Sequence, residues 1–222
     1  MPNKITLFVD IVSPFGYQAY WLTRNSPAFT KSNIAITYVP ILLGGLMNAT
    51  GNRPPLEIKN KDKWIDSQRK RWAKTFKIPM TENTPTPFPQ PTVATQRTLC
   101  HIQEAHPEKL AASLDALFKA FWVDGKGPIA KPDVIAEALE PVFGKEGLQE
   151  IMKGATSDAA KAKLKGNTEE AFKAGGFGLP WFVAENEKGE KDTFWGVDNI
   201  GHLLEFLGVD VKSENGRYKA ML

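Results

Sequence analysis

The pattern of hydrophobic and polar positions near the N-terminus changes from that of a strand to that of a helix. Residues 4–12 form a mostly apolar run, which predicts a buried strand, and residues 14–25 carry aromatic side chains at helical spacing. The run "IAITYVPI" at 34–41 predicts a second strand. A strand, a helix and a strand in this order predict two parallel strands joined by a right-handed crossover.

Helical periodicity dominates the middle of the chain, from about residue 61 to residue 174. Ile65, Trp72 and Phe76 share one stripe of the first segment, as is typical of an amphipathic helix. Two segments rich in glycine or proline, 44–55 and 79–91, predict loops. We expect further helices at 93–105, 108–123, 132–141 and 157–174.

The C-terminal segment, 178–208, returns to strands. It predicts a strand, a turn at 187–189, a second strand ending at Trp195, and a closing helix with a leucine-rich face. A sheet assembled from both chain ends, with helices inserted between them, accommodates the parallel crossover and the antiparallel hairpin. We therefore predict an α/β, thioredoxin-like fold. Its domain boundaries are predicted at 1–60 with 172–222 for the thioredoxin-like domain, and 61–171 for an inserted all-helical domain.

Composition narrows the class of protein. Of 222 residues, 42% are hydrophobic and 24% are charged, which is typical of a soluble globular protein. The net charge of +3, without arginine-rich tracts, argues against a nucleic-acid partner. Cys100 is the single cysteine, so an intrachain disulfide is excluded and a reducing compartment is favoured. We expect an intracellular protein without a membrane span, because no apolar run is long enough to cross a bilayer.

Ser13 stands where the first strand gives way to the first helix. Ser13-Pro14 fits a helix N-cap followed by proline at the first helical position, so a purely structural role accounts for it. The same helix start can also stabilise an anion, such as a thiolate, through backbone N–H groups and the hydroxyl. Thioredoxin-like oxidoreductases carry a CxxC motif here, but these two positions are Ser13 and Gly16, which excludes dithiol chemistry. Any sulfur must come from a ligand.

Two further segments offer candidate binding groups. The glycines before Leu179-Pro180 predict a helix end and a loop, and a cis-proline there would present the backbone of Leu179 to an extended peptide ligand. Asp198 is expected to cap the final helix, or to accept the ammonium group of a ligand if it faces a cleft. The three histidines match no metal motif, so we expect no metal site.

Four stretches, in order and at matching spacing, resemble the kappa-class glutathione transferases and their relatives, the 2-hydroxychromene-2-carboxylate isomerases. They are "FVDIVSPFGYQAYWL", "LLGGLMNATGNRPP", "KRWAKTFKIP" and "AGGFGLPWFVAENEKGEKDTFWGVDNIGHLLEFLG". The resemblance covers nearly the whole chain and implies a DsbA-like thioredoxin fold and a homodimer. It also implies glutathione as co-substrate and a small electrophile as second substrate.

The resemblance also implies roles for individual residues. Ser13 matches the catalytic serine that hydrogen-bonds the sulfur of glutathione, and Asp198 matches the acid that binds its γ-glutamyl end. The expected glutathione-binding residues are Asn52, Lys61, Leu179, Asp198 and Asn199. Gly16 and Val197 depart from the family pattern, since serine is frequent at the first position and occurs in some members at the second. A missing hydrogen bond to a charged group costs about 1.5–3 kcal/mol.

Three functions remain open at this point. The resemblance favours a kappa-type glutathione transferase. The same site could use glutathione to isomerise a hydroxychromene carboxylate between cis and trans forms. Alternatively, the chain is a non-catalytic DsbA-like module that binds a peptide or an anion. The C-terminal Ala220-Met221-Leu222 loosely resembles a peroxisomal address, and family members also occur in mitochondria, so we expect the peroxisome, the mitochondrion or the cytoplasm as compartment.

Overall fold

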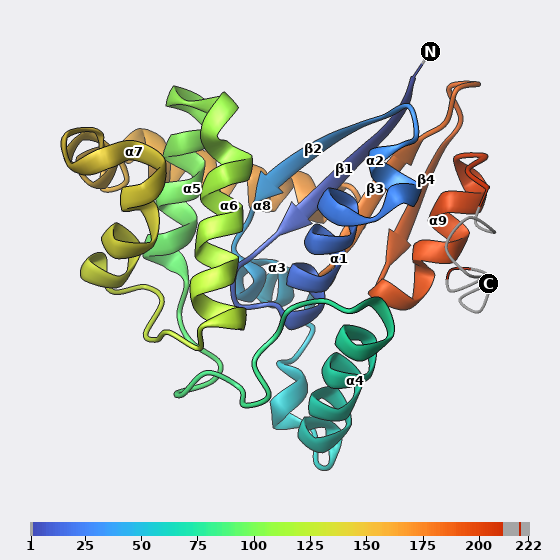
Figure 1. Cartoon of the computed structure of the whole chain (residues 1–222), viewed down its shortest axis with the longest axis horizontal. Coiled ribbons are helices and arrows are strands. Elements are labelled where there is room, and N and C mark those ends of the chain that lie inside the picture. The colour runs from blue at the N-terminus through green and yellow to red at the C-terminus, as the bar shows by residue number, and fades with distance from the viewer. Residues whose placement is uncertain (1, 211–217, 219–222) are drawn as a thin grey trace.

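A computed structural model of the chain describes residues 2–210 and residue 218. Within these residues four strands form a mixed sheet in the order β2-β1-β3-β4 (Figure 1). The strands are β1 (Asn3–Val9), β2 (Ile34–Pro40), β3 (Trp181–Glu185) and β4 (Lys191–Trp195). β1 pairs in parallel with β2 and antiparallel with β3, and β3 pairs antiparallel with β4. The predicted crossover and hairpin are both confirmed.

The helices lie on different sides of the sheet. The bundle of α5, α6 and α7 lies on one side of the sheet in Figure 1, α4 lies below it, and α9 lies at the opposite side. The helices are α1 (Pro14–Asn25), α2 (Pro27–Thr30), α3 (Leu43–Thr50), α4 (Lys61–Phe76), α5 (Val93–Ala105), α6 (Leu110–Phe118), α7 (Pro132–Gly154), α8 (Asp158–Lys173) and α9 (Ile200–Phe206). The α/β class with a large helical insertion is confirmed, and the domain boundary at residues 61 and 171 stays a prediction.

Alternation along β1 divides the core between the two faces of the sheet. Ile5, Leu7 and Val9 point into the larger cluster, which also holds buried residues of α1, α5, α6, α7 and α9. Phe8 points to the other face and packs in a smaller cluster with residues of β2, α3 and α8. Because successive side chains of a strand face opposite ways, helices from both halves of the chain are held against one central strand.

Strand β1 ends at Val9, three residues earlier than we predicted. The carboxylate of Asp10 accepts a hydrogen bond from the backbone N–H of Val12 at 3.1 Å, and the carbonyl of Asp10 accepts from Ser13 N–H at 3.0 Å. These bonds close a turn between strand and helix. Ile11 is nevertheless fully buried, so its apolar character reflects the core rather than a longer strand.

The prediction of a loop at 44–55 is wrong over its first part, because α3 spans Leu43–Thr50. Two distant side chains satisfy N–H groups at the start of this helix: the N–H of Leu42 donates to Thr168 and that of Leu43 donates to Asp10. Local glycine content favours a loop, but these tertiary contacts stabilise the helix. The helix ends at Gly51, whose φ of 69° is the left-handed conformation of a helix C-terminus.

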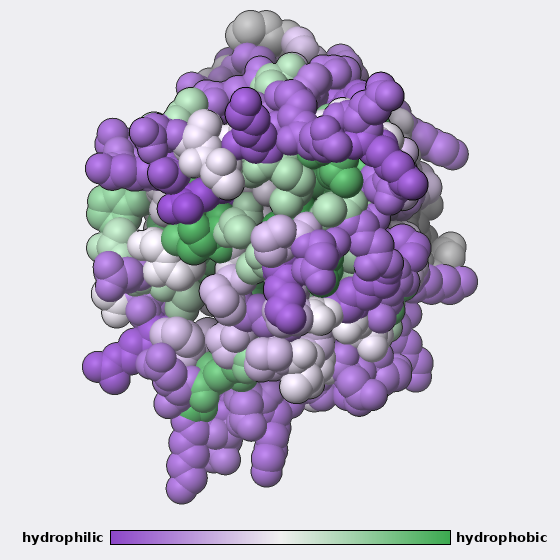
Figure 2. Space-filling view, turned by 90° about the vertical axis from the view of Figure 1, so that its left-hand side faces the viewer, coloured by the Kyte–Doolittle hydropathy of each residue, from purple (hydrophilic) through white to green (hydrophobic). Residues whose placement is uncertain are grey.

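Helix α7 is longer than the predicted 132–141. It continues past Pro141, changes direction at Gly144 (φ 67°, ψ 171°) and ends at Gly154. Its fully buried residues are few, and several of its apolar side chains are only half-buried. Figure 2 shows this side of the molecule, where hydrophobic surface is bordered by hydrophilic side chains.

Two sequence expectations concern membrane insertion and the C-terminal end. In the described part of the chain, we find no helix with the length and apolar character needed to span a membrane. Ala220-Met221-Leu222 lies outside the described residues, so the structure adds nothing to the peroxisomal interpretation.

Candidate functional site

Ser13 is the N-cap of α1, as predicted. Its hydroxyl oxygen accepts a hydrogen bond from the N–H of Gly16 at 2.9 Å, and Pro14 occupies the first helical position. In the part of the chain that the structure describes, no protein acceptor takes the hydroxyl proton of Ser13. The residue is 4% exposed, so a hydrogen bond made here would be shielded from water and correspondingly strong. Ser13 can therefore cap its helix and still donate one hydrogen bond to a ligand atom.

Gly16 leaves space beside the Ser13 hydroxyl. A Cβ atom at position 16 would lie 3.0 Å from the Cβ of Ser13 and 3.1 Å from its Oγ, which is closer than ordinary packing. The glycine that departs from the family pattern therefore relieves crowding at this helix start. It adds no hydroxyl of its own. Pro14 has no N–H, and the N–H groups of Gly16 and Tyr17 already bond Ser13, so the donors left for an anion here are the Ser13 hydroxyl and the N–H of Phe15.

Asp10 lies beneath the turn that holds Ser13, and sequence reasoning missed it. Its carboxylate is fully buried and accepts hydrogen bonds from the N–H of Leu43 at 2.8 Å and from the hydroxyl of Thr92 at 3.1 Å, besides that from Val12. Burial raises the pKa of Asp10, and these hydrogen bonds partly oppose the rise. The sequence offered one signal for this role, since Asp10 is the single acidic residue within the apolar run before Ser13.

The loop around Leu179 lies beside this helix start. The peptide bond Leu179-Pro180 is cis. Phe8 pairs with Trp181, so the chain leading into β3 passes the C-terminal end of β1, immediately before the Asp10 turn. The Nδ2 of Asn52 donates to the carbonyl of Phe177 at 2.8 Å. Asn52 thus ties the segment after α3 to the cis-proline loop, and its second amide hydrogen stays available for a ligand.

Asp198 lies next to the same loop but does not cap the final helix, contrary to the simplest expectation. The N–H of Gly196 donates to the carbonyl of Pro180 at 3.1 Å, which brings the 3₁₀ turn Val197–Asn199 beside the cis-proline. Gly196 has a φ of 92°, which favours glycine, and a Cβ there would lie 2.3 Å from Oδ1 of Asp198. The N-cap of α9 is Asn199, and its amide donates to the carbonyl of Trp195. Asp198 is exposed and can receive a cationic group.

Lys61 is less closely connected to the other candidates. It is the first residue of α4, its side chain is exposed, and its backbone N–H donates to Ile58. Among the described residues, its side chain makes no hydrogen bond or ion pair with Ser13, Asn52 or Asp198. The structure therefore gathers Ser13, Asn52, Leu179, Asp198 and Asn199 around the cis-proline loop and leaves Lys61 outside this set.

An aromatic cluster borders the site, and sequence reasoning did not single it out. The ring of Phe177 lies 4.9 Å from that of Trp195 and 5.4 Å from that of Trp181. Trp195 is 48% exposed and Phe177 is 37% exposed. Exposed aromatic surface beside polar side chains is typical of a ligand site.

Comparison with known proteins places the chain in a family. Residues 4–208 match the family described as the DSBA-like thioredoxin domain. The chain belongs to this family. Within the DSBA-like thioredoxin family its sequence is similar to that of kappa-class enzymes. It is 26% identical over 207 residues to glutathione S-transferase kappa 1 of Caenorhabditis elegans, covering 90% of this chain and 88% of that protein. It is 26% identical over 213 residues to the Rattus norvegicus enzyme of the same name, with 93% and 92% covered.

Solved structures of other DSBA-like proteins share the fold. A 2-hydroxychromene-2-carboxylate isomerase superposes with a TM-score of 0.72 at 22% identity, over 92% of this chain and 94% of that chain. The cytosolic disulfide reductase DsbM of Pseudomonas aeruginosa superposes with a TM-score of 0.63 at 15% identity, over 92% and 93%. The predicted DsbA-like fold and the resemblance to kappa-class transferases are thereby confirmed.

Proposed function

We propose that this DSBA-like protein is a glutathione transferase of the kappa type. The observation that carries the proposal is Ser13, whose hydroxyl caps α1 and keeps its own proton for a ligand acceptor. A thiolate at this point would receive that hydrogen bond and would face the positive end of the helix dipole. The similarity to kappa-class transferases along most of the chain supports glutathione as the source of the thiol.

The remaining candidate residues would hold the peptide part of glutathione. In this proposal the exposed carboxylate of Asp198 accepts the γ-glutamyl ammonium group, and Asn199 lies beside it. The backbone of Leu179 would bind the cysteinyl residue. Asn52 would donate its second amide hydrogen to glutathione. Lys61 would reach the glycyl carboxylate through its long exposed side chain.

The chemistry follows from lowering the pKa of the thiol. The thiol proton goes to solvent, and the bound thiolate then attacks an electrophilic carbon. In a substitution, the sulfur–carbon bond forms while the bond to the leaving group breaks, and the leaving group takes the electron pair. The chain supplies binding and charge stabilisation, and glutathione supplies the nucleophile.

Ser13→Ala tests this proposal. The thiolate absorbance of bound glutathione should be titrated against pH in the wild type and in the variant. A hydrogen bond to a charged group is worth about 1.5–3 kcal/mol, so the wild type should lower the thiol pKa by about one to two pH units, and Ser13→Ala should lose most of this effect. Ser157→Ala is the matched control, because Ser157 caps α8 in the same way.

Two results would contradict the proposal. Glutathione that does not bind in a calorimetric titration would favour the non-catalytic peptide- or anion-binding module. If glutathione binds and its thiol has the same pKa in the wild type and in Ser13→Ala, the role of Ser13 would be that of a helix cap alone.

The second candidate is a glutathione-dependent cis-trans isomerase. The fold likeness to a 2-hydroxychromene-2-carboxylate isomerase supports it, and the chemistry requires the same thiolate, which adds reversibly to a carbon–carbon double bond. Incubation with 2-hydroxychromene-2-carboxylate, with and without glutathione, separates the two candidates. Isomerisation that needs both glutathione and Ser13 would favour the isomerase, whereas a stable conjugate with an electrophile would favour the transferase.

A further inference from the structure

A groove between α3, α5 and α8 has the composition of a small-molecule site. It has a volume of about 370 Å³, which is within the range of ligand-binding cavities. Its lining shares no residue with the candidate glutathione site. The apolar part of the lining consists of Leu42, Ala49, Val93, Leu164 and Phe172. Phe172 is 46% exposed, so this apolar surface is open to a ligand.

The polar part of the groove is mostly cationic. Arg97, Lys161 and Lys165 line it, with Glu169 as the acidic residue. The Nζ of Lys161 forms an ion pair with the carboxylate of Asp158 at 2.8 Å, and the Nζ of Lys165 lies 3.7 Å from that of Glu169. The charges of these two lysines are therefore partly neutralised by neighbouring carboxylates. Among the described residues, no carboxylate pairs with Arg97.

Arg97 is the unusual member of this lining. Its Nε is buried and has no hydrogen-bond partner, and among the described residues its guanidinium makes no ion pair. A buried donor without a partner costs about 1–3 kcal/mol, more when it is charged, so such groups in proteins generally have an acceptor. The planar guanidinium fork matches a carboxylate in two parallel hydrogen bonds.

The start of α5 adds a second feature that favours an anion. Val93, the first residue of the helix, lines the groove, and Arg97 follows one turn later. Thr92, the N-cap, gives its hydroxyl proton to Asp10 and makes no capping bond to the first turn of α5. The positive end of this 13-residue helix therefore lies at the same groove as the unpaired guanidinium.

We propose that the groove between α3, α5 and α8 binds a small amphipathic carboxylate, with the carboxylate on Arg97 and an aliphatic or aromatic body on the apolar lining. The lysines at the rim attract the anion. The volume limits the ligand to a medium-length chain or one to two rings. This site is independent of glutathione and of Ser13.

The test uses octanoate as probe and the full-length protein without glutathione. Isothermal titration calorimetry should show saturable binding of one octanoate per chain, weakened by added salt. Because the guanidinium makes charge-assisted hydrogen bonds, octan-1-ol should bind at least about tenfold more weakly, and Arg97→Gln should weaken octanoate binding by at least about tenfold.

Further variants locate the site. Ala49 is exposed, so Ala49→Phe should fold normally and abolish octanoate binding by filling the groove. Lys163→Gln is the matched control, since Lys163 lies on α8 outside the groove, 3.9 Å from Glu104, and should bind octanoate like the wild type. Equal affinity for octan-1-ol, or unchanged octanoate binding in both Arg97→Gln and Ala49→Phe, would overturn the proposal. Loss of octanoate binding in Ser13→Ala would also overturn it, because the ligand would then occupy the glutathione site.

Discussion

At the scale of single residues, Asp10 organises the candidate site. Its carboxylate joins the end of β1, the start of α3 and the start of α5, and its backbone carbonyl positions Ser13. A buried carboxylate is costly unless its oxygens are hydrogen-bonded, and here donors from three segments meet it. The position of Ser13 is therefore fixed by the same Asp10 that connects β1, α3 and α5.

Asp10→Asn should change how stability depends on pH. Burial raises the pKa of Asp10, so the folded protein holds this proton more tightly than the unfolded chain. The resulting stabilisation is fully present below the ordinary pKa of 3.8 and is lost as pH rises through the raised pKa of the folded state. As pH rises from 3.8 through the raised pKa of Asp10, the contribution of this residue to the free energy of unfolding of the wild type should therefore decrease. The variant should not show this decrease.

Urea denaturation of both proteins from about pH 4 to about pH 8 measures this difference. We also expect Asp10→Asn to be less stable at the acidic end, because its amide group places N–H donors against other donors. Stability curves that run parallel over the whole range would contradict the interpretation of Asp10.

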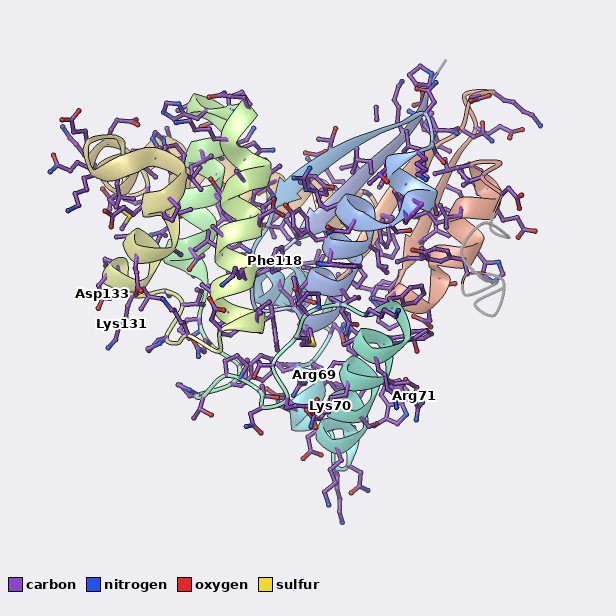
Figure 3. All side chains as sticks on the ribbon, in the orientation of Figure 1. Arg69, Lys70, Arg71, Phe118, Lys131 and Asp133 are labelled. Carbon is purple, nitrogen blue, oxygen red and sulfur yellow. The ribbon has the colours of Figure 1, made fainter. Side chains whose placement is uncertain are left out.

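At the scale of elements, a buried arginine adds polar contacts between α4 and the rest of the molecule. The side chain of Arg69 is 2% exposed and donates to the carbonyls of Thr81 and Glu82 at 2.8 and 2.6 Å, and to Asp66. Gln18 of α1 donates to the carbonyl of Arg69. Figure 3 shows Arg69 on the inner side of α4 and Arg71 on its outer side. These polar contacts fix the helix against both α1 and the proline-rich loop.

Arg69→Met should destabilise the protein by about 2–4 kcal/mol, because it removes several charge-assisted hydrogen bonds of a buried guanidinium and leaves the carbonyls of Thr81 and Glu82 without this donor. Arg71→Met is the matched control on the same helix. Arg71 is exposed, so its replacement should change the free energy of unfolding by no more than about 0.5 kcal/mol. Chemical denaturation monitored by tryptophan fluorescence measures both values, and equal effects would contradict the assigned role of Arg69.

At the scale of the whole molecule, Tyr218 packs against residues that are far from it in the sequence. Its ring is fully buried, 5.1 Å from the ring of Phe76 in α4 and 6.4 Å from that of Phe29 in α2. Its hydroxyl donates to Ser26 at 2.9 Å. Tyr218 thus connects this part of the chain with the start of α2 and with α4.

Two substitutions separate the packing of Tyr218 from its hydrogen bond. Tyr218→Phe keeps the ring and should cost about 1 kcal/mol, the typical value of one hydrogen bond. Tyr218→Ala also removes the ring from the core and should cost about 3–5 kcal/mol. Thermal and urea unfolding measure both, and a Tyr218→Ala protein as stable as the wild type would show that this contact contributes nothing.

The local sequence was sufficient where structure depends on near neighbours. Ser13-Pro14 specifies the start of α1, Ser157 specifies the start of α8, and alternation along β1 assigns its side chains to the two faces of the sheet. These signals are periodicity and capping, which act over a few residues. Together with the collinear motifs, they predicted the DsbA-like fold and the segments that form the candidate site.

The tertiary structure determined what depends on residues far apart in the chain. Asp10 binds Leu43 and Thr92, which are 33 and 82 positions away, and no local pattern encodes such pairings. The bond from Leu43 to Asp10, with that from Leu42 to Thr168, stabilises a helix in the glycine-rich segment for which the local pattern predicts a loop. The position of Asp198 over Gly196, and the groove with its unpaired Arg97, also arise only when separate elements pack together. A side chain's burial, partners and charge environment are properties of that packing, whereas its helical or strand tendency is a property of the sequence.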